Sequence, residues 1–276
     1  MNYIVWVGNF IFNVTKFLFL NIDVWINVWA SFLTLGIGAA LFILLKRRKL
    51  LQFFGLDKQN KLSILLSTLY IPSNTAITHS GSIISYQGPV IPEYEHQVIP
   101  IFSELFSLIT TGDSLIKTII GKILLGDVDI DYLNTPKSHT NISFHNFICV
   151  GGPSANSVTY YYMNQNQTWL GFNNTNAAIE IRRGRFKGKT LATPNLQDDY
   201  GILEKIIDKK NNSCVFIAAG CNYGATKASA YYLAHNWKNL QKEFDNNEFT
   251  LCLKVPQYFI DPNGYLHPTV IFKRKR

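Results

Sequence analysis

The longest hydrophobic run of this chain extends from Val24 to Leu45, and none of its 22 residues is charged. As an α-helix rising about 1.5 Å per residue, the run would reach about 33 Å, enough to cross the hydrocarbon core of a bilayer. It is too long for the apolar region of a cleaved signal peptide, and no small-residue cleavage site follows it. The pattern therefore predicts a transmembrane helix over residues 24–45; the alternative is a core helix of a soluble protein.

Three kinds of residue are expected to meet the membrane. Trp25 and Trp29 lie near one end of the helix, where aromatic side chains anchor at the interface, and Gly36 and Gly38 form a small-residue face at which helices pack closely. Cytoplasmic flanks carry an excess of Lys and Arg, so the basic flank that follows sets the orientation. The basic flank consists of Lys46, Arg47, Arg48 and Lys49. We therefore expect a membrane protein that contacts lipid and has a cytoplasmic C-terminal domain; the resemblance described below implies that the membrane is the bacterial inner membrane.

A second apolar stretch precedes this helix at residues 3–20 and is interrupted by Asn9, Asn13 and Lys16. We expect it to form a second span, so that residues 1–49 make a helical hairpin. The alternatives are an amphipathic segment in the membrane interface or an extension of the same helix. Asn9 and Asn13 are four residues apart and share one helix face, which in lipid seeks either the second helix or another copy of the chain. A homo-oligomer is therefore predicted.

The remaining residues, 57–276, are enough for one α/β domain. Short apolar runs predict strands at 61–71, 147–150, 177–182, 200–207, 214–219, 249–255 and 267–272, with a helix as the alternative for 61–71. Segments with helical period or helix-start signals predict helices at 92–108, 114–125, 154–163 and 226–237. Loops are expected at 126–136, which is acidic, at 183–189, which is basic, and at the turn 261–264.

The charge and the cysteines narrow the possible functions. The formal net charge is +8, but eight basic residues lie in the clusters 46–49 and 273–276, so the rest of the chain is close to neutral. This distribution favours contact with anionic lipid over nucleic acid, although the second cluster can equally be a solvated terminus. The spacing of the four cysteines does not fit a zinc site, and no H-x-x-x-H pair occurs, so no metal site is predicted.

Acidic residues give only weak signals for catalysis. Glu93, Glu95 and His96 lie near a predicted helix start, where a general base or an ordinary first-turn carboxylate would both fit. Asp198 and Asp199 directly precede the predicted strand 200–207; adjacent acids on a strand point to opposite faces, so they are not expected to act as a pair. The sequence leaves enzymatic activity open and leans against it.

A strand, a glycine-rich turn and a helix start follow one another at residues 146–163. These are the parts needed to bring main-chain N–H groups up to an anionic ligand. The spacing fits neither G-x-G-x-x-G nor a Walker loop, so ligand contact is inferred from the expected geometry alone. The candidate ligand-binding residues of this first turn are Gly151, Gly152, Ser154 and Asn156.

A second unit of the same kind follows, with a strand at 214–219 and a helix at 226–237. Gly220 and Gly224 allow close backbone approach, and Asn222 and Thr226 offer polar side chains, with Thr226 also a candidate helix cap. Two such units predict a Rossmann-like, mostly parallel sheet with a shared cleft at the carboxyl ends of its strands. The only cofactor-like ligand that this cleft suggests is a nucleotide.

The layout as a whole resembles the two-helix membrane effectors of bacterial antiphage defence systems, including those paired with retrons or with nucleotide-signal synthases. The resemblance rests on residues 3–45 as the membrane part and on the turns 151–156 and 220–226 in the α/β part. It implies a protein that is held inactive in the inner membrane until infection is sensed. Membrane damage then stops the host cell, which is abortive infection, and a reverse transcriptase or a nucleotide-signal synthase is encoded alongside.

Three functions are therefore carried forward. The first is a membrane effector whose α/β domain senses a trigger and whose hydrophobic helices disrupt the membrane. The second is a membrane-tethered enzyme acting on a nucleotide or nucleotide sugar in the cleft between Gly151 and Gly220. The third is an anchored interaction module that holds a partner protein at the membrane.

Overall fold

The structure is a computed structural model that describes residues 22–67, 69–71, 76–79, 82–85, 88–90, 97–107, 128–134, 143–173, 178–256 and 267–275. The chain divides into two compact units, Met1–Arg48 and Lys49–Arg276. The predicted span at 3–20, the predicted helix at 114–125, the turn at 261–264 and the group Glu93, Glu95 and His96 lie outside the described residues.

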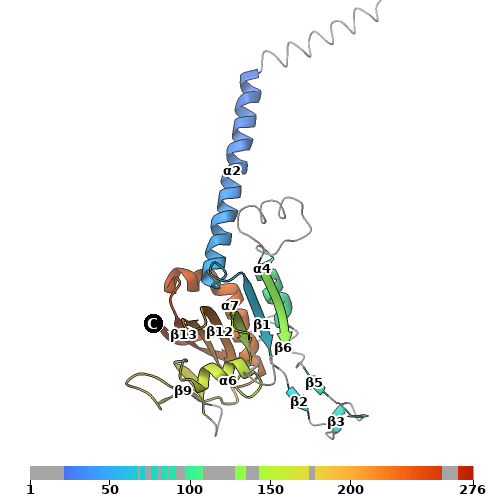
Figure 1. Cartoon of the computed structure of the whole chain (residues 1–276), viewed down its shortest axis with the longest axis vertical. Helices are drawn as coiled ribbons and strands as arrows, with labels where there is room; N and C mark the ends of the chain where they lie inside the picture. Colours follow the sequence, from blue (N-terminus) through green and yellow to red (C-terminus); the bar gives the residue numbers. More distant parts are fainter. Residues whose placement is uncertain are drawn as a thin grey trace, which may run out of the picture. The chain divides into compact units, whose positions relative to one another are not determined.

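The helix α2 (Ile22–Phe53) is drawn in blue in Figure 1 and confirms that residues 24–45 are helical. From Trp29 to Phe53 it is long and apolar enough to cross a membrane, by length and composition. Large apolar side chains along it are exposed, including Trp29 at 69% and Leu35 at 71%, and an added Cβ at Gly38 would meet open space. Trp25 and Gly36 lie in the helical backbone. In the basic flank, Arg48 and Lys49 are exposed and Lys46 is partly exposed, whereas Arg47 is buried.

Gly55 ends the helix. The Leu56 N–H donates to the Leu51 carbonyl at 2.8 Å and the Gly55 N–H donates to the Gln52 carbonyl at 3.2 Å, which is a Schellman motif. Gly55 has a φ of +75°, a value that glycine adopts at little cost. The last turn before it belongs to the second unit, whose core includes the fully buried Phe53.

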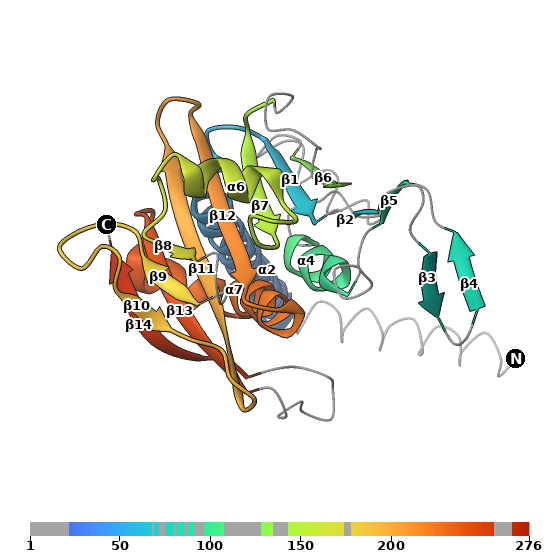
Figure 2. The ribbon, with the colours of Figure 1, turned by 90° about the horizontal axis from the view of Figure 1, so that it is seen from below.

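Seven strands form the central sheet in the order β14-β13-β11-β12-β7-β1-β6, and Figure 2 shows them side by side. Along the chain these are β1 (Lys61–Leu66), β6 (Asp129–Asn134), β7 (Asn146–Val150), β11 (Asp198–Asp208), β12 (Ser213–Gly220), β13 (Phe249–Pro256) and β14 (Thr269–Lys275). The neighbours β6, β1, β7 and β12 pair in parallel, and β13 runs in the same direction. Only β11 and β14 run the opposite way. The prediction of a mixed α/β domain with a mostly parallel sheet is confirmed.

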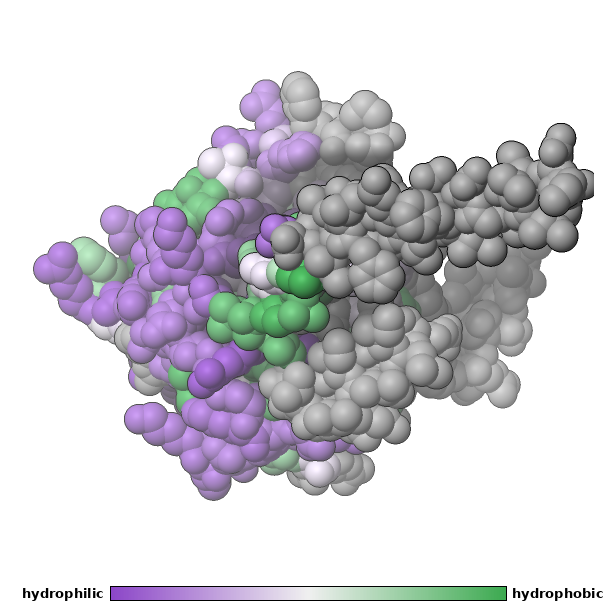
Figure 3. Space-filling view, turned by 90° about the horizontal axis from the view of Figure 1, so that it is seen from above, coloured by the Kyte–Doolittle hydropathy of each residue, from purple (hydrophilic) through white to green (hydrophobic). Residues whose placement is uncertain are grey.

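Each face of the sheet packs against a separate layer. On one face, α4 (Val98–Phe106), α7 (Tyr223–Phe244) and the last turn of α2 contribute to one core cluster. On the other face, α6 (Ser157–Asn164) and the small sheet of β8 (Leu170–Phe172), β9 (Ile179–Ile181) and β10 (Thr190–Ala192) contribute to a second. Because both faces are covered, the inner strands read as near-continuous apolar runs. Hydrophilic residues cover most of the described surface seen in Figure 3.

Several sequence predictions need correction. The predicted strand 61–71 is two strands, β1 and β2 (Leu69–Ile71), and β2 pairs with β5 (Gly88–Val90). A further hairpin, β3 (Ala76–His79) with β4 (Ser82–Ser85), was not among the predicted strands. The predicted acidic loop at 126–136 contains the strand β6, because Ile130 and Tyr132 pack on the core while Lys61 forms ion pairs with Asp129 and Asp131.

Candidate functional site

The carboxyl ends of β1, β7 and β12 meet at one edge of the sheet, since the three strands run in parallel. The chain passes from β1 outward to β6 and then returns to β7 on the other side of β1. The strand order therefore reverses between β1 and β7, and such a switch point is where open α/β sheets bind their ligands. This edge carries both glycine-rich turns that the sequence singles out.

Asn156 fills the space between the ends of β1 and β7. Its Nδ2 donates to the Leu65 carbonyl and to the Val150 carbonyl, each at 3.1 Å, and its Oδ1 accepts the N–H groups of Val158 and Thr159. The side chain is fully buried. Asn156 thus caps α6 and ties the two strands together, so it holds the turn in place and does not reach the surface.

The two glycine-rich turns lie next to each other, as the sequence predicts. The Gly151 N–H donates to the Ala218 carbonyl at 2.9 Å, and a Cβ added at Gly152 would lie 4.0 Å from the Gly220 carbonyl oxygen. In the first turn, Gly152 is partly exposed and Ser154 is exposed, whereas Gly151 is buried. The cleft that the sequence predicts would lie at this part of the edge, between Gly152 and Gly220; the cleft and its ligand both stay predictions.

The second turn is shaped by the start of α7. Asn222 caps the helix, and its Oδ1 accepts the N–H of Gly224 at 2.9 Å and that of Ala225 at 3.3 Å. The prediction that Thr226 caps the helix is wrong: it is buried, and its hydroxyl donates to the Asn222 carbonyl at 3.0 Å. Asn222 is exposed, and Gly220 and Gly224 are partly exposed. A Cβ at Gly220 would lie 2.3 Å from the Thr226 nitrogen, so only glycine lets the helix start this close to the strand.

Asp199, which is not among the predicted site residues, lies beside this helix start. It is 1% exposed; its Oδ1 accepts the Tyr200 N–H at 2.8 Å, and the main-chain N–H groups of Asn222 and Ala225 also favour its charge. Burial outweighs these hydrogen bonds and raises the pKa of the Asp199 carboxyl above its usual range. Such an acid next to a cleft is a candidate for proton transfer. Its neighbour Asp198 points the other way and forms an ion pair with Lys254 at 2.8 Å.

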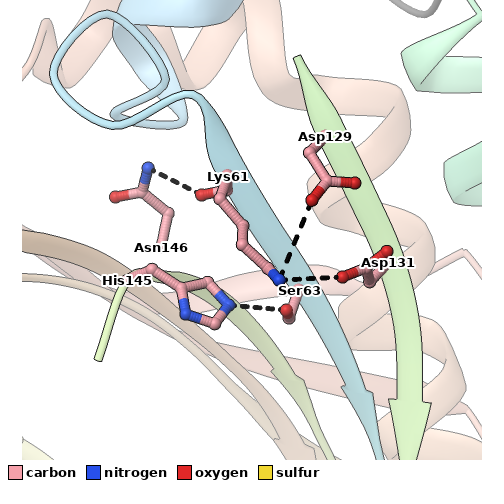
Figure 4. Close-up of polar contacts among 6 residues, drawn as sticks. All are labelled: Lys61, Ser63, Asp129, Asp131, His145 and Asn146. Atoms are coloured by element: carbon pink, nitrogen blue, oxygen red, sulfur yellow. Dashed lines mark hydrogen bonds and ion pairs between the residues drawn. The ribbon is translucent and has the colours of Figure 1, made fainter. Parts of the chain in front are cut away.

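A polar cluster lies at the amino ends of β1, β6 and β7 (Figure 4). Lys61 Nζ lies 3.2 Å from an Asp131 carboxylate oxygen, and the Ser63 Oγ lies 2.6 Å from the His145 Nε2. Burial lowers the pKa of His145, so its ring stays neutral and can accept the Ser63 hydroxyl proton. Ser63 is fully buried, however, so no substrate reaches its hydroxyl as the strands stand. The cluster joins three strands and is a structural feature.

Thiol and metal chemistry find little support in the described part of the chain. The four cysteines are free, and burial raises the pKa of the Cys221 thiol, the one nearest the cleft, to about 12. That thiol is therefore protonated and a poor nucleophile at neutral pH. Among the described residues, no three or more His, Cys, Asp or Glu side chains are grouped so that they could hold a metal ion.

Two cavities lie at the opposite edge of the sheet, around the end of β11. One has a volume of 660 Å³ and the other 320 Å³, and Ile207, Asp208 and Lys209 line both of them. The smaller is also lined by Lys205, a lysine in the middle of a buried strand. A lysine within the run Ile202 to Ile207 is a signal that sequence reasoning missed, because a buried strand rarely carries one.

Comparison with known proteins adds no assignment: the chain matches no family model, no curated protein and no solved structure. Its function is therefore argued from the geometry.

Proposed function

We propose that this chain is a membrane effector of bacterial antiphage defence: α2 anchors it in the inner membrane, and a cytoplasmic, Rossmann-like domain senses a trigger. The observation that carries the proposal is the exposure of α2. Trp29, Leu33 and Phe42 are each 68–69% exposed along a helix with no charged residue from Val24 to Leu45. A soluble protein does not leave such a surface in water, whereas a bilayer covers it.

The basic flank supports the orientation. Lys46 to Lys49 directly follow the apolar run, and the excess of Lys and Arg marks the cytoplasmic side. The α/β domain then faces the cytoplasm, where an infection signal is available. In line with the resemblance seen in the sequence, we propose that the trigger is a nucleotide or a product of a reverse transcriptase encoded alongside. We further propose that triggered copies self-associate and breach the membrane.

Membrane integrity tests this proposal. Cells express the full chain, the chain without residues 1–45, or the chain with residues 1–45 replaced by an unrelated single-span anchor, and dye entry and membrane potential are followed. The chains are overexpressed so that self-association does not need the trigger, and we expect depolarisation only with the full chain. Equal depolarisation with the unrelated anchor would refute a role of the native helix in membrane damage.

A second candidate, a membrane-tethered enzyme acting on a nucleotide, is favoured by one observation. The buried acid Asp199 lies beside the Gly152–Gly220 cleft at the start of α7. Nucleotide binding by the full chain in detergent micelles is the common test of both candidates. Gly152→Val should abolish it, since the side chain fills the cleft, whereas Ser154→Ala should not. Asp199→Asn should retain nucleotide binding in either case. If the chain is an enzyme, the same variant should abolish turnover.

A further inference from the structure

The basic loop between β9 and β10, residues 183–189, has a well-defined backbone. The Gly188 N–H donates to the Ile181 carbonyl at 2.7 Å, and the Lys187 N–H donates to the Gly184 carbonyl at 3.1 Å. Gly184 and Gly188 have φ values of +79° and +84°, a region that favours glycine. The loop therefore presents its charged side chains from a turn that is already formed.

Trp169, which directly precedes β8, joins this loop to the last strand of the chain. The Arg274 guanidinium of β14 lies 3.6 Å from the centre of the Trp169 ring, and that of Arg183 lies 5.5 Å from it. A Cβ added at Gly184 would lie 2.9 Å from the same ring, so the loop rests against it. Figure 2 shows β14 beside the small sheet of β8, β9 and β10. Cations that are far apart in the sequence thus share one surface.

Phe186 places an aromatic ring among these cations. The residue is 49% exposed, and its ring centre lies 4.6 Å from the Arg185 guanidinium and 5.9 Å from Lys189 Nζ. Lys187 follows it and is also exposed. We call this surface the basic patch, and it consists of Arg183, Arg185, Phe186, Lys187, Lys189 and Arg274.

The charge of the basic patch is not cancelled by its neighbours. None of the ion pairs among the described residues involves a cation of the patch. Glu180 lies on β9, two residues before Arg182. Asp208 and Glu248 line the 660 Å³ cavity, together with Lys209 and one arginine of the patch. Arg182 and Lys209 offset two of these three acids, so the five cations of the patch remain in excess.

We propose that the basic patch binds the sugar–phosphate backbone of a single-stranded nucleic acid, with Phe186 stacked on one of its bases. The planar guanidinium of arginine binds two phosphate oxygens at once, and stacking on an aromatic ring holds it in position. Proteins bind single strands by combining cations with open aromatic rings, because every unpaired base has a face on which a ring can stack. A duplex hides these faces between its base pairs.

The same surface fits a layer of anionic lipid less well. Binding in a membrane interface scales with the apolar area that is inserted. Phe186 is the only large apolar residue of the loop 183–189, and Arg185 and Lys187 flank it directly. A single ring between two cations offers little area to insert, whereas it suffices to stack on one base. The inference deepens the function proposed above, and it rests on that function only in regarding the bound strand as the trigger.

Fluorescence anisotropy with the full chain in uncharged detergent micelles measures the binding. The probe is a labelled oligothymidylate of about 20 nucleotides, longer than the usual site of one domain. Each phosphate contact of a single strand adds about −0.7 to the slope of log affinity against log salt concentration, so about five contacts should give about −3.5. An oligouridylate of the same length is the second probe, and the tighter of the two identifies the source as DNA or RNA. No binding of either probe at low salt would overturn the proposal.

Charge reversal tests the position of the site. Arg185→Glu combined with Lys187→Glu should weaken binding at least about tenfold and reduce the salt slope by about 1.4. The matched control combines Lys238→Glu with Lys242→Glu, which changes the net charge equally at two exposed positions of α7. Because solvent and salt screen distant charges, it should weaken binding by less than about twofold. Equal weakening by the two double variants would contradict the assignment to the basic patch.

The aromatic ring distinguishes a single strand from a duplex. Phe186→Ala should weaken oligothymidylate binding about fivefold and leave a duplex of the same length unaffected. Tyr160→Ala, which removes a similarly exposed ring from α6, should affect neither. If Phe186→Ala binds oligothymidylate as tightly as the native chain, the assignment to single strands is wrong.

Lysine acetylation, followed by peptide mass spectrometry, separates a nucleic acid from a membrane as the occupant. The full chain is placed in nanodiscs of phosphatidylcholine, with or without phosphatidylserine. Oligothymidylate should slow the acetylation of Lys187 and Lys189 several-fold in neutral nanodiscs and leave Lys238 unchanged. Protection by phosphatidylserine alone would assign the surface to the membrane and overturn the proposal. A full chain that binds oligothymidylate but does not depolarise cells would reject the effector function and leave this surface supported.

Discussion

Glu204 occupies the middle of β11, and replacing it with glutamine should remove a pH dependence that its burial creates. The side chain is 2% exposed, and its Oε1 accepts the Trp169 N–H at 2.7 Å. This hydrogen bond and those from Thr250 and Leu170 favour the charged carboxylate, but burial outweighs them and raises the pKa from 4.5 to about 8. Glu204 is therefore protonated in the native state at neutral pH.

The sign follows from proton binding. Between pH 4.5 and about 8 the native state keeps a proton that the unfolded state has lost, so the free energy of unfolding falls as the pH rises through this window. At about 1.4 kcal/mol per pKa unit, holding Glu204 protonated costs ~3 kcal/mol at pH 7 and ~1 kcal/mol at pH 5. The difference, ~2 kcal/mol, corresponds to a Tm change of ~4–8 °C for a domain of this size.

Thermal unfolding of the full chain in detergent micelles, from pH 5 to pH 8, measures this effect. Glu204→Gln keeps an acceptor for the Trp169 N–H and has no charge to lose, so it should melt at a higher temperature than the native chain at pH 7, and the two should converge toward pH 5. Glu248→Gln is the matched control, because Glu248 also accepts a main-chain N–H, from Ile207 at 2.9 Å. If Glu204→Gln shows the same dependence on pH as the native chain, the reasoning about Glu204 is wrong.

Three further predictions concern the described sites. Burial lowers the pKa of His145 below 6.5 in the folded protein, so the free energy of unfolding should fall as the pH drops from 6.5 toward that lowered pKa. In the same melting assay, His145→Gln should weaken this loss of stability at acidic pH. Gly220→Ala should destabilise the domain by about 2 kcal/mol or more, since the added Cβ would meet backbone atoms at 2.3 and 2.6 Å. Gly152→Ala is the matched control: its Cβ would lie 4.0 Å from the nearest atom, so it should change Tm little. Asn156→Ala should cost about 2–3 kcal/mol through the lost cap and the lost hydrogen bonds to the Leu65 and Val150 carbonyls, while the exposed Ser154→Ala stays within about 0.5 kcal/mol; equal melting of the two variants would contradict the role given to Asn156.

The strand–turn–helix units were predictable because their signals are local. An apolar run, a glycine turn and an asparagine that can cap a helix are all visible in a few residues, and both units fold as expected at β7–α6 and β12–α7. The adjacency of Gly152 and Gly220 also follows, since the ends of parallel strands meet at one edge. What the local pattern does not contain is which residue caps: Asn222 and Thr226 are both good caps by type, and the geometry selects Asn222.

Three features that the sequence did not reveal share one physical origin, namely partners distant in sequence. β6 reads as an acidic loop because Asp129 and Asp131 disfavour a strand, and only the pairing with Lys61 on β1 neutralises them. The reversed direction of β11 leaves no trace in its apolar pattern, which is the same for parallel and antiparallel neighbours when both faces are covered. The burial of Lys205 likewise depends on Phe53, at the end of a helix far away in the chain.

β11 is the strand on which these observations meet. It carries four buried ionisable residues, one at the cleft edge, two in the middle and one at the cavity edge: Asp199, Glu204, Lys205 and Asp208. Its neighbour β12 lies equally deep and carries no charged residue, so depth in the sheet does not require such groups. A buried ionisable side chain costs free energy unless it is hydrogen-bonded or kept neutral. A strand that only completed the sheet would be more stable with apolar residues at these positions. β11 therefore carries a buried ionisable residue near each of its ends, and substitutions along this strand are the most direct way to separate the cleft from the cavity.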